Sequence, residues 1–126
     1  MKSYGQVLIV DDSSTSRMII QRCMQMAGID VKEYLFAENG LDGFGHLRAN
    51  KGIELVITDI NMPKMDGRTF ATLLRGDPEM AAISIIIVSS IADSALESEL
   101  LALGVKSVVK KPVSPAKMLL AVGGEA

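Results

Sequence analysis

Short aliphatic runs alternate with helical patterns along the whole chain, and this alternation most constrains the fold. The predicted strands are Gln6–Val10, Val31–Phe36, Leu55–Thr58, Ser84–Val88 and Ser107–Lys110. The predicted helices are Arg17–Ala27, Leu41–Ala49, Gly67–Leu74, Asp93–Leu103 and Ser114–Val122. Most strand runs are continuously apolar, which indicates strands buried on both faces. Strands that alternate with helices are typical of a parallel sheet covered by helices on both sides.

This pattern predicts an α/β fold with a doubly wound, five-stranded parallel sheet and five helices. Right-handed crossovers leave few strand orders, and the flavodoxin-like order 2-1-3-4-5 suits five strands. The chain has 126 residues, so we expect one domain over residues 1–126. In this topology a ligand site is expected at the carboxyl ends of strands 1 and 3, where the strand order reverses.

Polar side chains follow four of the predicted strands. Asp11 and Asp12 end the first strand, Asp59 the third, Ser89 the fourth and Lys111 the fifth. Carboxyl ends of parallel strands share one edge, so we expect these residues to lie together. Neighbouring carboxylates repel one another unless a cation such as Mg²⁺ joins them. A carboxylate can also form an acyl phosphate, and a lysine and a hydroxyl suit phosphoryl oxygens.

Each of these residues also has a structural explanation when it is taken singly. Asp11 and Asp12 fit a helix cap followed by a first-turn acid. Asp59 fits the cap of a turn. Ser89 fits a loop hydroxyl and Lys111 a solvated charge. Their joint placement at corresponding strand ends favours the chemical interpretation.

His46 and most methionines have structural interpretations. His46 lies among polar residues of the second helix and is predicted to be an exposed surface residue. Met18 and Met26 fall within the apolar pattern of the first helix and are interpreted as core. Met62 and Met65 follow Asp59, and a contact surface remains an alternative for them.

Composition bounds the partners and the compartment. The net charge is −2 and no stripe of Lys or Arg is visible, so we expect no direct binding of nucleic acid. The run Ile85–Val88 is far shorter than a membrane span, and Val7–Val10 is too short for a signal peptide. The lone Cys23 excludes an internal disulfide and suits a reducing compartment. We therefore expect a cytoplasmic protein with no membrane partner.

Four segments resemble the receiver domain of two-component response regulators, and most closely the single-domain chemotaxis regulators. They are Val10–Arg17, Thr58–Gly67, Val88–Ser90 and Lys110–Pro112. The segment around the aspartate of the third strand is the most specific, and the others add order and spacing. The resemblance extends over nearly the whole chain, from Gln6 to about Val122.

The resemblance implies a role for each acidic residue. Asp59 corresponds to the phosphoacceptor, and the expected cofactor is Mg²⁺ or Mn²⁺. Asp12 corresponds to a direct metal ligand, and Asp11 to one that acts partly through water. Asn61 corresponds to the residue that lends its backbone carbonyl to the metal, while Asp59 completes the metal site.

The resemblance also assigns the switch and the residues that set the lifetime of the phosphoryl group. Ser89 corresponds to the hydroxyl that moves toward the phosphoryl group, and Lys111 to the lysine that pairs with its oxygens. The family often has a cis bond before the proline found here as Pro112. Asn61 and Ile91 correspond to the pair that flanks the path of the attacking water.

A phosphorylation-dependent signalling switch is the implied function. The chain is expected not to be an enzyme, although it would catalyse its own phosphorylation and autodephosphorylation. The expected partners are a sensor histidine kinase and a downstream protein bound through the face of helix 4, strand 5 and helix 5. One departure affects this face: the family usually has Tyr or Phe on strand 5, where this chain has Val108.

Three other functions remain open from the residues alone. A flavin or nucleotide carrier has the same fold, but Asp11-Asp12 would repel a phosphate without metal. A phosphatase of the haloacid dehalogenase type uses a second aspartate two residues after its nucleophile, where this chain has Asn61. A degenerate receiver that serves only as an adaptor would lack Mg²⁺ binding.

Overall fold

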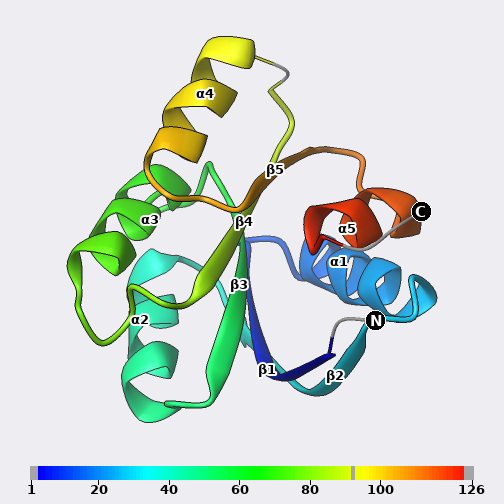
Figure 1. Cartoon of the computed structure of the whole chain (residues 1–126), viewed down its shortest axis with the longest axis horizontal. Helices are drawn as coiled ribbons and strands as arrows, with labels where there is room; N and C mark the ends of the chain where they lie inside the picture. The colour runs from blue at the N-terminus through cyan, green and yellow to red at the C-terminus, as the bar shows by residue number, and fades with distance from the viewer. Residues whose placement is uncertain (1–2, 92, 124–126) are drawn as a thin grey trace.

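The computed structural model describes residues 3–91 and 93–123 and contains a five-stranded sheet between two layers of helices (Figure 1). The strands are β1 (Ser3–Val10), β2 (Asp30–Ala37), β3 (Ile53–Asp59), β4 (Ser84–Ser89) and β5 (Ser107–Lys110). The helices are α1 (Ser14–Met26), α2 (Gly40–Ala49), α3 (Gly67–Gly76), α4 (Ser94–Ala102) and α5 (Pro115–Ala121). The strand order is β2-β1-β3-β4-β5 and all pairs are parallel, which confirms the predicted topology.

Successive residues of the central strands point to opposite faces of the sheet. On β1, Leu8 and Val10 join a core cluster with α2, α3 and α4. Val7 and Ile9, which alternate with them along the strand, join a second cluster with α1 and α5. Figure 1 shows α1 and α5 together on one side of the sheet, and α2 and α3 on the other. Burial on both faces explains why the buried parts of these strands, such as Val7–Val10, are continuously apolar.

Each helix begins with a side chain that caps its backbone. The five caps are Ser13, Asn39, Asp66, Asp93 and Ser114, and each accepts a hydrogen bond from a backbone N–H of the first turn. Because every helix follows a strand, these helix starts lie near the carboxyl edge of the sheet. The positive ends of the helix dipoles therefore surround that edge, which favours negative charge there.

The prediction that Met18 and Met26 belong to the core was wrong. Met18 and Met26 are 65% and 71% exposed, whereas α1 buries Ile20, Cys23 and Met24 against the sheet. At 100° per residue, the three buried positions lie on one face of the helix and the two exposed methionines lie outside it. Cys23 is thus buried on the face of α1 that packs against the sheet.

The two methionines after Asp59 pack against the core. Met62 and Met65 are partly buried beside the cluster that includes α2 and α3. A Cβ added to Gly40 would lie 2.7 Å from the Met65 sulfur, so the start of α2 fits closely against this loop. His46, which was predicted to be an exposed surface residue, is half-buried on α2. Its backbone carbonyl accepts the N–H of Asn50.

Candidate functional site

The carboxyl edge of the sheet brings together the three predicted acidic residues. Asp11 and Asp12 follow β1, and Asp59 is the last residue of β3. One carboxylate oxygen of each lies within 4.8 Å of the others. Asp11 and Asp59 are buried, whereas Asp12 is exposed. The prediction that the strand ends gather these side chains is therefore correct.

Lys111 lies between two of the carboxylates. Its Nζ is 3.4 Å from Asp11 Oδ2 and 3.5 Å from Asp59 Oδ2. Lys111 forms ion pairs with two of the three clustered carboxylates, so the carboxylates of the cluster outnumber the ammonium group paired with them. A divalent cation with oxygen ligands would balance them, and Mg²⁺ commonly binds one or two carboxylates while keeping several waters.

The surroundings of Asp59 raise the pKa of its carboxyl. Burial is the largest cause, and the nearby carboxylate of Asp11 adds to it. Lys111 and the backbone N–H of Ile60 act in the opposite direction. That N–H donates to Asp59 Oδ1 over 2.8 Å. The folded protein therefore bears an electrostatic cost for an ionised Asp59 when no metal is bound.

Asp59→Asn should therefore stabilise the metal-free protein at neutral pH. A raised folded-state pKa means that stability is fully present below the ordinary carboxyl pKa and is lost as pH rises through the folded value. The neutral amide avoids this loss, so we expect a gain on the order of 1 kcal/mol in unfolding free energy at pH 7 and none near pH 3. Urea unfolding in a chelating buffer measures both.

Asp66→Asn is the matched control, because Asp66 is an exposed helix cap on the loop after Asp59 and asparagine also caps helices. It should change stability little at either pH. A less stable Asp59→Asn at pH 7 would contradict the electrostatic cost assigned to Asp59.

Two residues that contact Asp11 were not predicted. Ser16 Oγ donates to Asp11 Oδ2 over 2.5 Å, and Arg17 Nη1 donates to the Asp11 carbonyl over 2.6 Å. The backbone N–H of Ser13 donates to Asp11 Oδ1 over 3.0 Å. The signal available in the sequence is spacing, because Ser16 and Arg17 lie on the first turn of the helix that follows the acidic pair.

The loop from β3 to α3 folds closely onto Asp59. The backbone N–H of Gly67 donates to the Ile60 carbonyl over 2.8 Å. A Cβ added to Gly67 would collide with the Asp59 carbonyl, so only glycine fits here. Asn61 is exposed on this loop, two residues after Asp59. Its carbonyl accepts none of the loop and turn hydrogen bonds found among the described residues.

Ser89 and Ile91 are joined to each other at the end of β4. Ser89 is buried, and its Oγ accepts the backbone N–H of Ile91 over 3.1 Å. It lies one position beyond Val88, which is the register partner of Asp59. Ile91 is 49% exposed and lines a hollow of about 290 Å³ between α4 and β5, together with Val108. The Lys111–Pro112 peptide bond is cis, as the resemblance implies.

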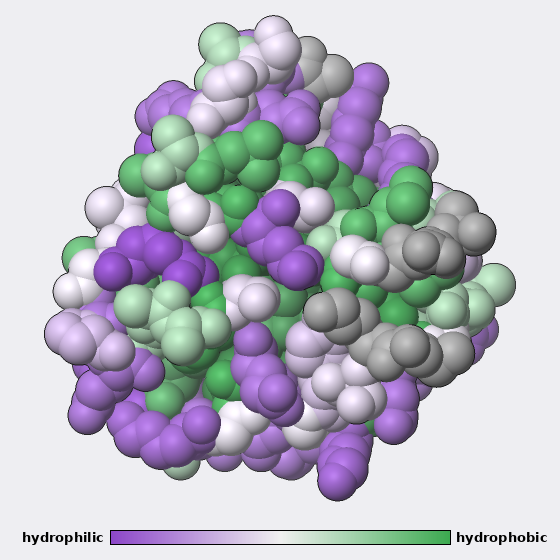
Figure 2. All heavy atoms as spheres, in the orientation of Figure 1, coloured by the Kyte–Doolittle hydropathy of each residue, from purple (hydrophilic) through white to green (hydrophobic). Residues whose placement is uncertain are grey.

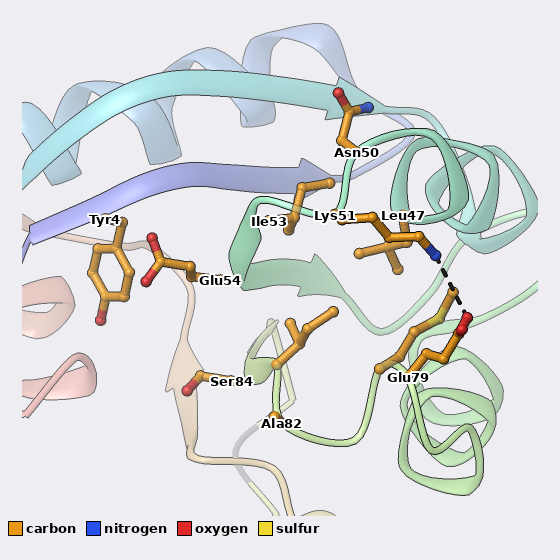
Figure 3. A pocket seen from close by; sticks show the side chains of 11 residues that line it. Tyr4, Leu47, Asn50, Lys51, Ile53, Glu54, Glu79, Ala82 and Ser84 are labelled. Carbon is orange, nitrogen blue, oxygen red and sulfur yellow. Dashed lines mark hydrogen bonds and ion pairs between the residues drawn. The ribbon is translucent and has the colours of Figure 1, made fainter.

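A separate pocket of about 380 Å³ lies at the opposite edge of the sheet (Figure 3). Its lining includes Tyr4, Ile53 and Ser84, which belong to the starts of β1, β3 and β4. Lys51 and Glu79, which form an ion pair over 3.5 Å, also line this pocket. This pocket is therefore remote from the acidic cluster and contributes no group to it.

Known proteins share this fold and much of this sequence. The response regulator receiver domain family matches residues 7–123. The chain therefore belongs to the response regulator receiver domain family. It is 34% identical over 110 residues to the chemotaxis protein CheY1 of Helicobacter pylori, which covers 87% of each chain. Chemotaxis regulators of the CheY type are thus among its relatives.

Two solved structures illustrate the likeness. A response regulator receiver protein from Pseudomonas putida has 30% identity and a TM-score of 0.81, with 99% of this chain and 100% of that chain covered. The CheX-CheY-BeF₃-Mg²⁺ complex of Borrelia burgdorferi has 28% identity and a TM-score of 0.81, with 94% and 86% covered. Within residues 3–91 and 93–123, no helix has the length and apolar character needed to cross a membrane.

Proposed function

We propose that the protein is a phosphorylation-dependent signalling switch, formed by one receiver domain over residues 1–126, that accepts a phosphoryl group on Asp59. The observation that carries the proposal is the placement of Asp59, buried at a strand end within 3.5 Å of the Lys111 ammonium and beside two further carboxylates. The proposed donor is the phosphohistidine of a sensor histidine kinase. The proposed compartment is the cytoplasm, which suits a chain with a single buried thiol.

The acidic cluster would hold Mg²⁺ or Mn²⁺ for this reaction. Asp12 is exposed and suits a direct ligand, whereas both carboxylate oxygens of Asp11 already accept hydrogen bonds, which suits contact through water. Asp59 and the carbonyl of Asn61 would complete the protein ligands. When bound, the metal supplies positive charge for the phosphoryl oxygens.

The chemistry is a transfer followed by hydrolysis. A carboxylate oxygen of Asp59 attacks phosphorus, the bond from phosphorus to the donor nitrogen breaks, and an acyl phosphate forms. Lys111 pairs with the negative phosphoryl oxygens. Later a water attacks the same phosphorus, its proton is lost to solvent, and the bond to Asp59 breaks to release phosphate. The chain is thus a switch that resets itself and has no separate substrate to turn over.

The proposed output surface is the face formed by α4, β5 and α5. Figure 2 shows apolar surface in this region, around β5. The hollow between α4 and β5 contains Ile91, Leu96 and Val108, and Leu120 of α5 is 59% exposed on the other side of β5. The CheY protein of Borrelia burgdorferi, solved with CheX, supports a protein partner for a chain of this kind.

Beryllofluoride with Mg²⁺ tests the switch, because it mimics a phosphoryl group on an aspartate. We expect Ser89 to move toward the mimic and to give up its hydrogen bond with the Ile91 N–H. Amide chemical shifts should then change at Ile91 and along α4 and β5, as well as beside Asp59. Changes confined to the neighbours of Asp59 would contradict output through this face. No response at all would indicate a degenerate receiver.

Ile91→Glu should shorten the lifetime of the acyl phosphate. A carboxylate at this position can orient the attacking water, whereas isoleucine cannot hydrogen-bond through its side chain. We expect decay about tenfold faster, equal to about 1.4 kcal/mol in the barrier. Single-turnover decay of the phosphorylated protein measures it, and Ile91→Val is the matched control. Equal decay in all three proteins would mean that Ile91 only packs on the loop and lines the hollow.

A further inference from the structure

Ser16 makes one of the shortest hydrogen bonds in the site. Its Oγ lies 2.5 Å from Asp11 Oδ2, and the carboxylate can only accept, so the serine hydroxyl donates. The backbone N–H of Ser16 donates in turn to Oγ of the helix cap Ser13 over 3.2 Å. The first turn of α1 therefore holds the hydroxyl in place against the carboxylate.

Asp11 depends on this hydroxyl because its carboxylate is fully buried. Oδ1 has one donor, the Ser13 N–H at 3.0 Å. Oδ2 has two, the Ser16 hydroxyl at 2.5 Å and the Lys111 ammonium at 3.4 Å. Buried charge is costly unless hydrogen bonds and opposite charge compensate it. Without Ser16, only the lysine would remain on Oδ2.

Lys111 is shared almost evenly between two carboxylates. Its Nζ is 3.4 Å from Asp11 and 3.5 Å from Asp59, so it is tightly paired with neither. An ammonium group held at this distance can turn toward new phosphoryl oxygens without breaking a close ion pair. This sharing requires that Asp11 be satisfied by another donor.

We infer that Ser16 is a positioning residue for the phosphoryl site, an inference that rests on the proposed function. Its hydroxyl satisfies Asp11, and so leaves Lys111 available to Asp59 and to the incoming phosphoryl group. Removing the hydroxyl increases the uncompensated charge on Asp11. That charge attracts Lys111 away from Asp59, and it also attracts a divalent cation more strongly.

In Ser16→Ala, metal binding should become stronger while phosphoryl uptake becomes slower. Mg²⁺ should bind about three- to tenfold more tightly, which is within the range for the loss of one typical intramolecular hydrogen bond. Phosphoryl uptake from acetyl phosphate at saturating Mg²⁺ should be at least about threefold slower, because Lys111 is drawn toward Asp11. General damage to the fold would weaken metal binding and slow uptake together.

Titration calorimetry with Mg²⁺ alone and the rate of acetyl phosphate labelling measure the two effects. Ser16→Thr keeps the hydroxyl and should restore both values to within about twofold of wild type. Ser14→Ala is the matched control on the same helical turn, where Ser14 is exposed and its side chain makes none of the site contacts.

Three outcomes are distinguishable. Tighter Mg²⁺ binding with slower uptake in Ser16→Ala, restored by threonine, supports the inference. Unchanged values, or changes of both in the unfavourable direction, overturn it while leaving the proposed function intact. A wild-type protein that neither binds Mg²⁺ nor takes up phosphoryl groups refutes the proposed function itself.

Discussion

With Mg²⁺ and acetyl phosphate, the wild-type protein should take up one phosphoryl group per chain, and Asp59→Asn should take up none. A neutral amide cannot form an acyl phosphate, whereas a carboxylate can. Asparagine keeps the shape of the side chain and an oxygen for the Ile60 N–H, so the site geometry should persist. The bound group should be stable in acid and labile in base. Intact mass spectrometry and phosphate release measure these properties.

Asp66→Asn again serves as the control, since it removes a carboxylate from the same loop outside the acidic cluster. It should be labelled as fast as wild type. Stoichiometric labelling of Asp59→Asn would refute Asp59 as the phosphoacceptor and would direct attention to Asp12, the exposed member of the cluster.

The fold could be predicted from the sequence because burial on both faces leaves continuous apolar runs at every central strand. The ends of elements were less predictable. β1 begins at Ser3 instead of Gln6, and α1 begins at Ser14 instead of Arg17. The first residues of β1 are partly exposed, so they lack the apolar signal that identifies its centre. The start of α1 is set by the Ser13 cap, a local contact that periodicity does not reveal.

The membership of the acidic cluster could also be predicted, because parallel strands bring their carboxyl ends to one edge. The hydrogen bonds and ion pairs among these side chains could not be predicted. Spacing alone does not state that Ser16 donates to Asp11, or that Lys111 divides itself between Asp11 and Asp59. These contacts depend on rotamers and on the placement of the first turn of α1. Met18 was misassigned for the same reason, since apolar character does not specify which helix face meets the sheet.

Lys111→Met should slow phosphoryl uptake by about 100-fold, the usual effect of losing one fixed electrostatic group from a site where charge develops. This corresponds to about 2.7 kcal/mol in the barrier. Methionine has similar length, so the main change is loss of the ammonium group within 3.5 Å of Asp59. Mg²⁺ binding should not weaken, because all three carboxylates remain and one competing positive charge is gone.

Lys110→Met is the matched control, because this neighbouring lysine is exposed and forms none of the ion pairs seen among the described residues. It should be phosphorylated at the wild-type rate. Uptake at saturating Mg²⁺ separates the two lysines, since any difference in metal affinity no longer contributes. Wild-type uptake by Lys111→Met would remove the lysine from the phosphoryl site and leave it only as the counter-ion of Asp11. Slow uptake with undiminished Mg²⁺ binding would instead establish that the ammonium group acts on the phosphoryl group itself.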